Sequence, residues 1–576
     1  MRGLLIFFLA LFVGGCQNKK QKSSGNGAEK INVTSKYSCV PAISDTLWYT
    51  SENKAPLFNN LGDHHFPITT KSELAQKYFD QGLVLAYGFN HAEAARSFYY
   101  ATKLDPDCAM CYWGYAYVLG PNYNAGMEEG NYERAYKAIE KAEERAGKVT
   151  EKERSLIKAL SKRYVKLPIE DRSSLDEAYS AALKDLSKKY PGDTDIKVLY
   201  AESLMDLHPW DLYDKKGDPK EWTPEIVNLL EEIIKNNPRH PGAHHFYIHA
   251  TEASKTPQLA YISADAFDKD LVPGAGHLVH MPSHVYIRTG DYHKGTLANL
   301  RAVKVDSNYV TQCHAQGAYP LAYYPHNYHF LAATAALEGN RKYAMLGAKK
   351  VSEHVHPDLM KEQGWGTLQH YYVIPFYVMV KMGDWNGILD SELQTYDLPY
   401  PEAVRHYARG MAFLGKDQPG RAKMELEALE RISKNPALAQ VNIWEINSVD
   451  HLVQIARRVL KAEIIASETS DYEASFALLK EAVEIEDALN YDEPPDWFFS
   501  VRHHLGAVQN EAGNYEDAVK TYFEDLEKLP KNGWAYHGLA RAYKGLNDPE
   551  KLTEIQEHLK ESWEYADIQI DNSRIK

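Results

Sequence analysis

Helical patterns recur along this chain at nearly regular intervals, and this repetition limits the fold more than any other feature of the sequence. Apolar residues follow the period of an α-helix, and Asp-Pro or Asn-Pro pairs end the segments, whereas strand patterns are nearly absent. A single compact core rarely serves a chain of 576 residues. The sequence therefore predicts an all-α array of helical hairpins that stack on one continuous core.

Small residues and aromatic residues recur at fixed offsets in several segments. They include Tyr78 to Pro106 with Gly82, Ala94, Phe98 and Ala101, the segment of Tyr286, Gly290 and Ala302, the segment of Gly513, Ala518 and Tyr522, and further centres at Gly114, Gly339, Gly383, Gly415 and Ala474. The spacing resembles that of tetratricopeptide (TPR) repeats, helix-turn-helix units of about 34 residues. The resemblance spans roughly residues 61 to 560 and implies a right-handed superhelix with a concave groove. Small residues allow close helix contact, and an aromatic side chain from the second helix plugs the next hairpin.

Three motifs also resemble those of exported bacterial TPR lipoproteins with a His-rich middle region. They are Gly88-Phe89-Asn90-His91-Ala92-Glu93-Ala94, Asp105-Pro106-Asp107-Cys108-Ala109-Met110 and Pro273-Gly274-Ala275-Gly276-His277. No activity is established for that group, so the resemblance implies a fold and not a chemistry.

The N-terminus carries an export signal. Arg2 precedes the apolar run Leu4 to Val13, which is too short to span a membrane as a mature helix, and Gly14-Gly15-Cys16 follows. We expect a lipoprotein signal in residues 1–16, with lipid attached to Cys16 and anchorage in the bacterial envelope, the outer membrane being favoured. The alternative is an ordinary secretory signal with a chance cysteine.

The rest of the chain divides into three predicted parts. Residues 17–60 form a polar tether and N-terminal extension, 61–395 an N-terminal TPR-like superhelix with a His-rich groove, and 396–576 further TPR-like repeats. The net charge of -14 argues against nucleic acid as a partner, because phosphate binding needs an excess of Lys and Arg.

The disulfide pairing of the four cysteines besides Cys16 stays open. They are Cys39, Cys108, Cys111 and Cys313. In an exported chain, Cys108 and Cys111 form a local disulfide, a soft metal pair or a redox pair, and a structural role is favoured.

Histidines concentrate in the middle of the chain. Ten of the 24 lie between His244 and His329, where even spreading would place about 3.6. Members of each run are three, four or seven positions apart, the spacing of one helix face. With Gly290, Gly339 and Gly383 set at one repeat position, the TPR resemblance places these runs on one wall of the groove. The candidate metal ligands are His245, His249, His277, His280, His284, His326, His329 and His370.

Imidazoles from neighbouring helices suit a transition metal such as Cu, Zn or Fe. A trio at i, i+3 and i+7 spans about 10 Å, so we expect ligands for each ion from different helices, with room for two ions. Glu252 follows His249 on the same face and is the candidate catalytic residue; roles as a ligand or as an orienting group stay open.

One feature weakens this alignment of the repeats: Pro282 lies inside the expected helix of His277, His280 and His284. A helix that begins at Pro282 would leave the first two histidines in a loop. For His64, His65 and His91 a packing role is favoured over capping one end of the groove. For Arg502 an interhelical ion pair is favoured over binding a carboxylate or phosphate in the groove.

These patterns favour a solenoid that binds a transition metal, and whether it is also a hydrolase or oxidoreductase stays open. The alternatives are a non-catalytic scaffold whose groove, rich in Tyr, holds a peptide or protein partner, and a periplasmic metal carrier.

Overall fold

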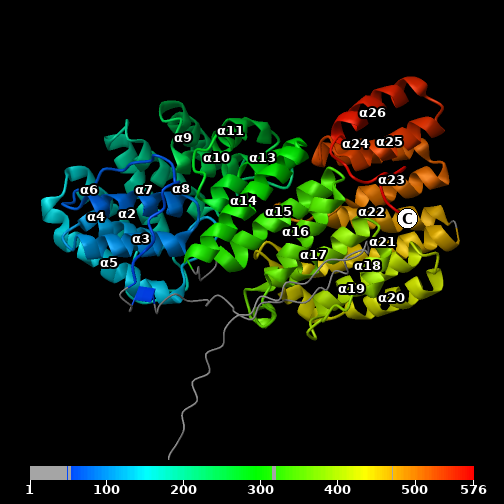
Figure 1. Cartoon of the computed structure of the whole chain (residues 1–576), viewed down its shortest axis with the longest axis horizontal. Helices are drawn as coiled ribbons and strands as arrows, with labels where there is room; N and C mark the ends of the chain where they lie inside the picture. The colour runs from blue at the N-terminus through cyan, green and yellow to red at the C-terminus, as the bar shows by residue number, and fades with distance from the viewer. Residues whose placement is uncertain (1–47, 50–52, 314–318, 470) are drawn as a thin grey trace, which may run out of the picture.

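α-Helices dominate the computed structural model, which describes residues 48–49, 53–313, 319–469 and 471–576. Figure 1 shows an elongated molecule that runs from α2–α9 at one end through α10–α17 to α18–α26 at the other. The first third contains α2 (Glu73–Tyr87), α3 (His91–Leu104), α4 (Ala109–Val118), η1 (Glu129–Asn131), α5 (Tyr132–Arg145), η2 (Ala146–Lys148), α6 (Glu151–Ser161), α7 (Ser173–Lys189), α8 (Thr194–Leu207) and α9 (Thr223–Asn236). The middle contains α10 (Pro241–Thr251), η3 (Pro257–Ala260), α11 (Tyr261–Asp268), α12 (Gly276–His280), α13 (Pro282–Thr289), α14 (Tyr292–Cys313), η4 (Tyr319–Tyr323), α15 (Tyr324–Leu337), α16 (Arg341–Glu353), η5 (Leu359–Lys361) and α17 (Gly366–Lys381).

The last third begins at α18 and includes one short antiparallel strand pair. It contains α18 (Trp385–Asp390), α19 (Pro399–Leu414), α20 (Pro419–Ile432), η6 (Pro436–Gln440), β1 (Asn442–Ile443), β2 (Asn447–Ser448), α21 (Val449–Glu468), α22 (Tyr472–Asp487), α23 (Val501–Ala512), α24 (Tyr515–Lys528), α25 (Gly533–Gly545) and α26 (Pro549–Ser562).

Consecutive helices pack as hairpins, and glycines set how closely they approach. A Cβ atom on Gly82 of α2 would lie 2.9 Å from the ring of Phe98 in α3, and one on Gly114 of α4 would lie 2.4 Å from it. Phe98 therefore fills the space between its own hairpin and the next. Tyr522 of α24 does the same between Gly506 of α23 and Gly538 of α25. The predicted all-α TPR-like solenoid is confirmed in these hairpins.

The middle of the chain departs from regular hairpins at a proline. Pro282 occupies the first turn of α13, where its missing N–H is tolerated, and Met281 separates that helix from α12. The expectation of one helix through His277, His280 and His284 is therefore wrong. The alternative is right that a helix begins at Pro282, but His277 and His280 lie in the short helix α12 and not in a loop. Pro375 lies inside α17 without ending it.

Buried apolar side chains form two large clusters that meet where α13 ends. One extends from Ala55 to Tyr286 and the other from Ile287 to Trp534. The boundary expected near residue 395 stays a prediction.

The last repeats fold back on the middle hairpins. The Trp534 indole donates to the carbonyl of Ala336 at 2.8 Å, and Tyr292 donates to the carbonyl of Pro530 at 2.8 Å. An ion pair of 3.1 Å joins Lys531 to Asp291. These contacts hold the C-terminal helices against the histidine-bearing segment.

Two cysteines of the first repeats are joined to each other. Cys108 and Cys111 form a buried disulfide at the start of α4, and the Cys108 sulfur accepts a hydrogen bond from the backbone N–H of Cys111. The signal segment with Cys16, the tether through residue 47, and Cys39 lie outside the described residues. Among the residues that are described, no helix combines the length and apolar character needed to cross a membrane.

Candidate metal centre

Six of the eight predicted ligands meet as two groups of three. His245, His249 and His277 form the first group, which we call set A, and His280, His284 and His326 form the second, set B. Within each set the ligand atoms lie within 4.8 Å of one another. Each set combines side chains from separate helices.

Set A lies between α10 and α12. Pro241 fits the first turn of α10, and the His240 side chain accepts the Ala243 N–H at 3.2 Å to cap it. His245 and His249 follow one turn apart on the same face. The Nε2 atom of His245 lies 3.2 Å from Nε2 of His277.

Set B lies between the α12–α13 segment and α15. His280 ends α12, His284 lies in the first turn of α13, and His326 lies in the first turn of α15. Ring centroids of His280 and His284 are 4.8 Å apart, and those of His280 and His326 are 5.0 Å apart. The helix break at Met281 therefore divides the histidine run, because His277 joins set A while the next two join set B.

One carboxylate connects the two sets. Glu252, at the C-terminal end of α10, accepts a hydrogen bond from Nδ1 of His249 at 2.8 Å and another from Nδ1 of His284 at 2.6 Å. Burial alone would raise the pKa of Glu252, but the imidazoles of His284 and His249 lower it to about 2. Glu252 is thus an ionised group with both oxygens engaged. These contacts favour an orienting role over the catalytic role predicted from its spacing.

Hydrogen bonds at Nδ1 also orient other rings. His245 Nδ1 contacts the carbonyl oxygen of Tyr87, and His280 Nδ1 contacts the side-chain oxygen of Asn299 at 2.7 Å. A ring that donates from Nδ1 keeps a lone pair on Nε2 when it is neutral. The Nε2 atoms of His249, His280 and His284 are buried without a hydrogen-bond partner among the described residues.

Burial keeps most of these rings neutral. The pKa of His245, His277, His280 and His326 is held well below the usual value of 6.5, chiefly because burial penalises the charged form. Neutral imidazole is the form that binds metal ions. His326 keeps part of its residue surface exposed, although its Nδ1 atom is buried.

His329 and His370 lie together outside both sets. Their ring centroids are 5.4 Å apart; His329 stacks on Phe498, and His370 Nδ1 pairs with the hydroxyl of Tyr400 at 2.8 Å. Neither belongs to a three-ligand group among the residues described. The repeat alignment placed both on the same wall as the other histidines, but they pack against each other and against Phe498 and Tyr400, apart from both sets.

Other parts of the chain cover the wall that carries the two sets, whereas the TPR resemblance implied that this wall lines an open groove. Five of the six rings belong to residues that are at most 3% exposed. The segment between α22 and α23 lies opposite and contributes Asp492 and Glu493 to the same small cavity as His249. The segment that covers the histidines therefore lies more than 150 residues beyond them in the sequence.

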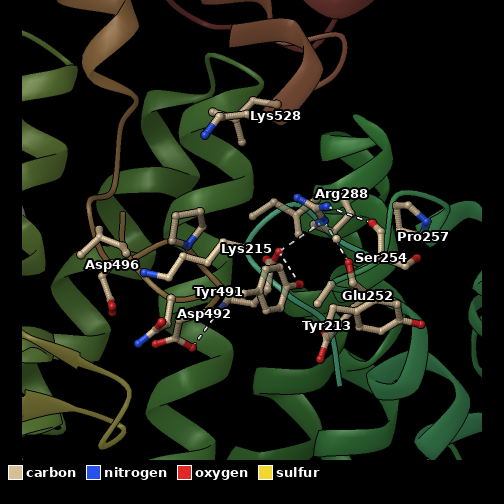
Figure 2. A pocket seen from close by; sticks show the side chains of 18 of the residues that line it. Tyr213, Lys215, Glu252, Ser254, Pro257, Arg288, Tyr491, Asp492, Asp496 and Lys528 are labelled. Carbon is tan, nitrogen blue, oxygen red and sulfur yellow. Dashed lines mark hydrogen bonds and ion pairs between the residues drawn. The ribbon is translucent and has the colours of Figure 1, made fainter. Parts of the chain in front are cut away.

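A much larger cavity of about 1190 Å³ adjoins this centre and shares His249 and Trp210 with the small cavity. Figure 2 shows Glu252 and Ser254 on one side of this cavity and Asp492 on the other, with Arg288 and Tyr491 between them. Arg288 donates to the carbonyl oxygens of Glu252 and Ser254 at 3.0 and 3.3 Å. It thereby fixes the end of α10 that carries the connecting carboxylate.

Sequence reasoning missed the acidic part of the centre. Asp492 and Glu493 are buried, and burial raises the pKa of Glu493 to about 8. The acidic segment Asp492-Glu493-Pro494-Pro495 is visible in the sequence, but its position opposite the histidines depends on the tertiary fold. The nearby Arg502 makes the expected interhelical ion pair, donating to Asp487 at 2.9 and 2.7 Å.

A further cluster joins His64 and His240 to Asp195 at 3.1 and 3.3 Å. His240 Nδ1 accepts a backbone N–H, so the neutral ring carries its proton on Nε2, toward Asp195. Burial would raise the pKa of Asp195, but the two histidines hold it well below its usual range. This chemistry favours a structural ion cluster over a ligand set.

Comparisons with known proteins give only distant structural similarities. No protein-family model and no curated protein matches the chain. A human IFIT1 dimer with m7Gppp-AAAA is similar at 12% identity over 87% of this chain and 92% of that chain, with a TM-score of 0.31. Yeast Tom70 is similar at 13% identity over 85% and 100%, with a TM-score of 0.32. At these TM-scores neither similarity bears on the fold, which rests on the helical hairpins of the chain itself.

Proposed function

We propose that this protein binds a pair of transition-metal ions, one in each histidine set, and uses them in a hydrolytic or oxidative reaction. The observation that carries the proposal is the convergence of buried imidazoles, among them His249, His280 and His284, whose Nε2 atoms lack partners among the described residues while Nδ1 is held by oxygen acceptors. Metal-ligating histidines typically have this second hydrogen bond.

The spacing of His245 and His277 fits a common ion. Two nitrogens bound to a tetrahedral zinc at 2.0–2.1 Å lie about 3.3 Å apart. The observed separation of the two Nε2 atoms is 3.2 Å. Imidazole ligands without a thiolate suit Cu, Zn or Fe.

The surrounding residues support a reaction. Bound ions of this kind supply Lewis acidity and activate water or dioxygen. Glu252 fixes one ring of each set, and Arg288 fixes the backbone around Glu252. The large cavity borders set A at His249, and its wall includes Tyr123, Trp210 and Tyr491, which offer contact area with polar tips to a substrate.

Envelope attachment is part of the same proposal. The Val13-Gly14-Gly15-Cys16 sequence supports lipid attachment at Cys16. A mature chain that begins at Cys16 would then present the metal centre outside the cytoplasm.

Elemental analysis tests the metal claim. A chain lacking residues 1–16 is purified after growth with Cu, Zn and Fe, and then dialysed. The expected result is close to two ions per chain; fewer than about 0.2 ion per chain would end the metal proposal, since a preformed buried site retains its metal. In that case a solenoid that holds a peptide or protein partner in its large cavity becomes the better account. A loaded chain that turns over no hydrolytic or oxidative probe substrate indicates a metal carrier.

A further inference from the structure

A small cavity of about 40 Å³ lies between the histidine sets and the C-terminal repeats. This is room for a few water molecules or ligand atoms. Imidazoles of both sets form one wall, and carboxyl groups from the segment between α22 and α23 form the facing wall. The lining includes His249, His277, His284, His326, Asp492 and Glu493.

Glu493 has one oxygen in need of a partner. Its residue is only 3% exposed, and Oε1 accepts a hydrogen bond from the Tyr491 hydroxyl at 2.8 Å. Arg288 approaches the same oxygen at 4.0 Å. Oε2 is buried and has no hydrogen-bond partner within the described part of the chain. A buried carboxylate oxygen is costly to leave unpaired.

The metal pair in turn needs negative charge. Neutral imidazoles do not offset the charge of two divalent ions, and a buried uncompensated charge is strongly unfavourable. Both oxygens of Glu252 already accept a hydrogen bond, from His249 and from His284, so this carboxylate is committed to orienting the rings. The carboxyl groups across the small cavity are therefore the ones left to complete the centre.

Among those groups the geometry favours Glu493. Asp492 accepts the backbone N–H of Glu493 at 2.8 Å, which ties it to its own loop. Asp496 also has an oxygen that lacks a partner among the described residues, but it lines only the large cavity.

We propose that Glu493 supplies a carboxylate ligand to the metal pair, so that the C-terminal repeats complete a centre whose imidazoles come from the middle hairpins. This inference rests on the proposed function. Zinc and related ions accept mixed imidazole and carboxylate sets. The solenoid must then close before the complete centre exists, and metal binding holds its two halves together.

The test compares Glu493→Gln with Asp496→Asn, a matched change in the same loop. Zinc chloride is titrated into each metal-free chain in competition with a chelator. Wild type and Asp496→Asn are expected to bind two ions with equal affinity, whereas Glu493→Gln should lose about 10–100-fold in affinity for at least one ion. Equal binding by Glu493→Gln would overturn this inference and leave the proposed function intact. A wild-type chain that binds neither zinc nor copper nor iron in such titrations would overturn both.

Cobalt chloride gives a second readout that separates ligation from folding. The visible absorption of bound Co²⁺ should change in Glu493→Gln and stay the same in Asp496→Asn, with Glu493→Asp recovering part of the wild-type spectrum. An unchanged spectrum in Glu493→Gln would show that the carboxylate is not a ligand. The same conclusion follows if Asp496→Asn changes the spectrum as much.

Discussion

The Nδ1 atom of His284 donates a hydrogen bond of 2.6 Å to one oxygen of Glu252. The other oxygen of this carboxylate accepts from His249, which belongs to the other histidine set. A single buried side chain therefore orients one ligand of each proposed ion.

Replacing Glu252 by Gln should weaken both ions together. The amide retains one acceptor oxygen but places an NH₂ group against the second Nδ1, so one ring loses its orientation and both lose the nearby negative charge. We expect a loss of about 10–100-fold in metal affinity, measured by chelator competition. The control is Glu338→Gln, because Glu338 also contacts a histidine Nδ1, that of His293, at 2.9 Å and lies outside both sets. Equal affinities in the two variants would contradict the orienting role.

Replacing a single histidine of either set should remove only the ion bound by that set. His249→Ala is expected to empty set A and His280→Ala set B, so that each variant retains about one of two ions by elemental analysis. His370→Ala should retain both, although His370 is equally buried, because it lies outside the sets. Far-ultraviolet circular dichroism should show wild-type helicity in all three. If His249→Ala and His280→Ala unfold the chain while His370→Ala does not, the histidines of the sets are structural.

Stability should fall as the pH rises, partly through Glu338. Burial raises the pKa of this carboxyl to about 8 in the folded chain, against about 4.3 in an unfolded one. The folded state therefore holds a proton that the unfolded state releases, so this contribution is complete below about pH 4 and is lost as the pH rises toward 8. Glu338→Gln cannot release that proton. Its melting temperature should decline less between pH 6 and 9 than that of the wild type, and parallel declines would refute the assignment.

The close packing between hairpins leads to a separate prediction about the stability of the fold. Gly114→Ala would place a methyl group 2.4 Å from the ring of Phe98, so we expect a loss of about 1–3 kcal/mol and a lower melting temperature. Gly420 lies in α20, where an added methyl group would meet no described atom within 4 Å, and its change to Ala should be within about 0.5 kcal/mol of neutral. Similar melting temperatures for the two variants would mean that the close packing around Phe98 is not required.

Local sequence patterns predicted the hairpins and much of the histidine centre. Helical spacing is enough to place His245 above His249 and His280 near His284, because side chains one turn apart share a face. Pro282 in the sequence indicated that a helix could begin there, but no local pattern predicts that this break assigns His277 to one set and His280 to the other. Spacing also placed His329 and His370 on the same wall, because it does not show which side chains of other helices pack against each histidine.

Local sequence patterns could not predict the contacts between distant repeats. Glu493 faces the histidines only because the C-terminal helices fold back, through contacts such as that between Trp534 and the carbonyl of Ala336. Lipid attachment at Cys16 and the envelope location remain predictions from the sequence.

Anomalous X-ray scattering at the absorption edge of the bound metal tests the central claim most directly. Crystals of the chain lacking residues 1–16, grown with the metal identified by elemental analysis, should show two peaks. One is expected among His245, His249 and His277 and the other among His280, His284 and His326, each about 2.0–2.2 Å from imidazole nitrogens. Peaks confined to surface residues, or no peak in either histidine set, would contradict the account.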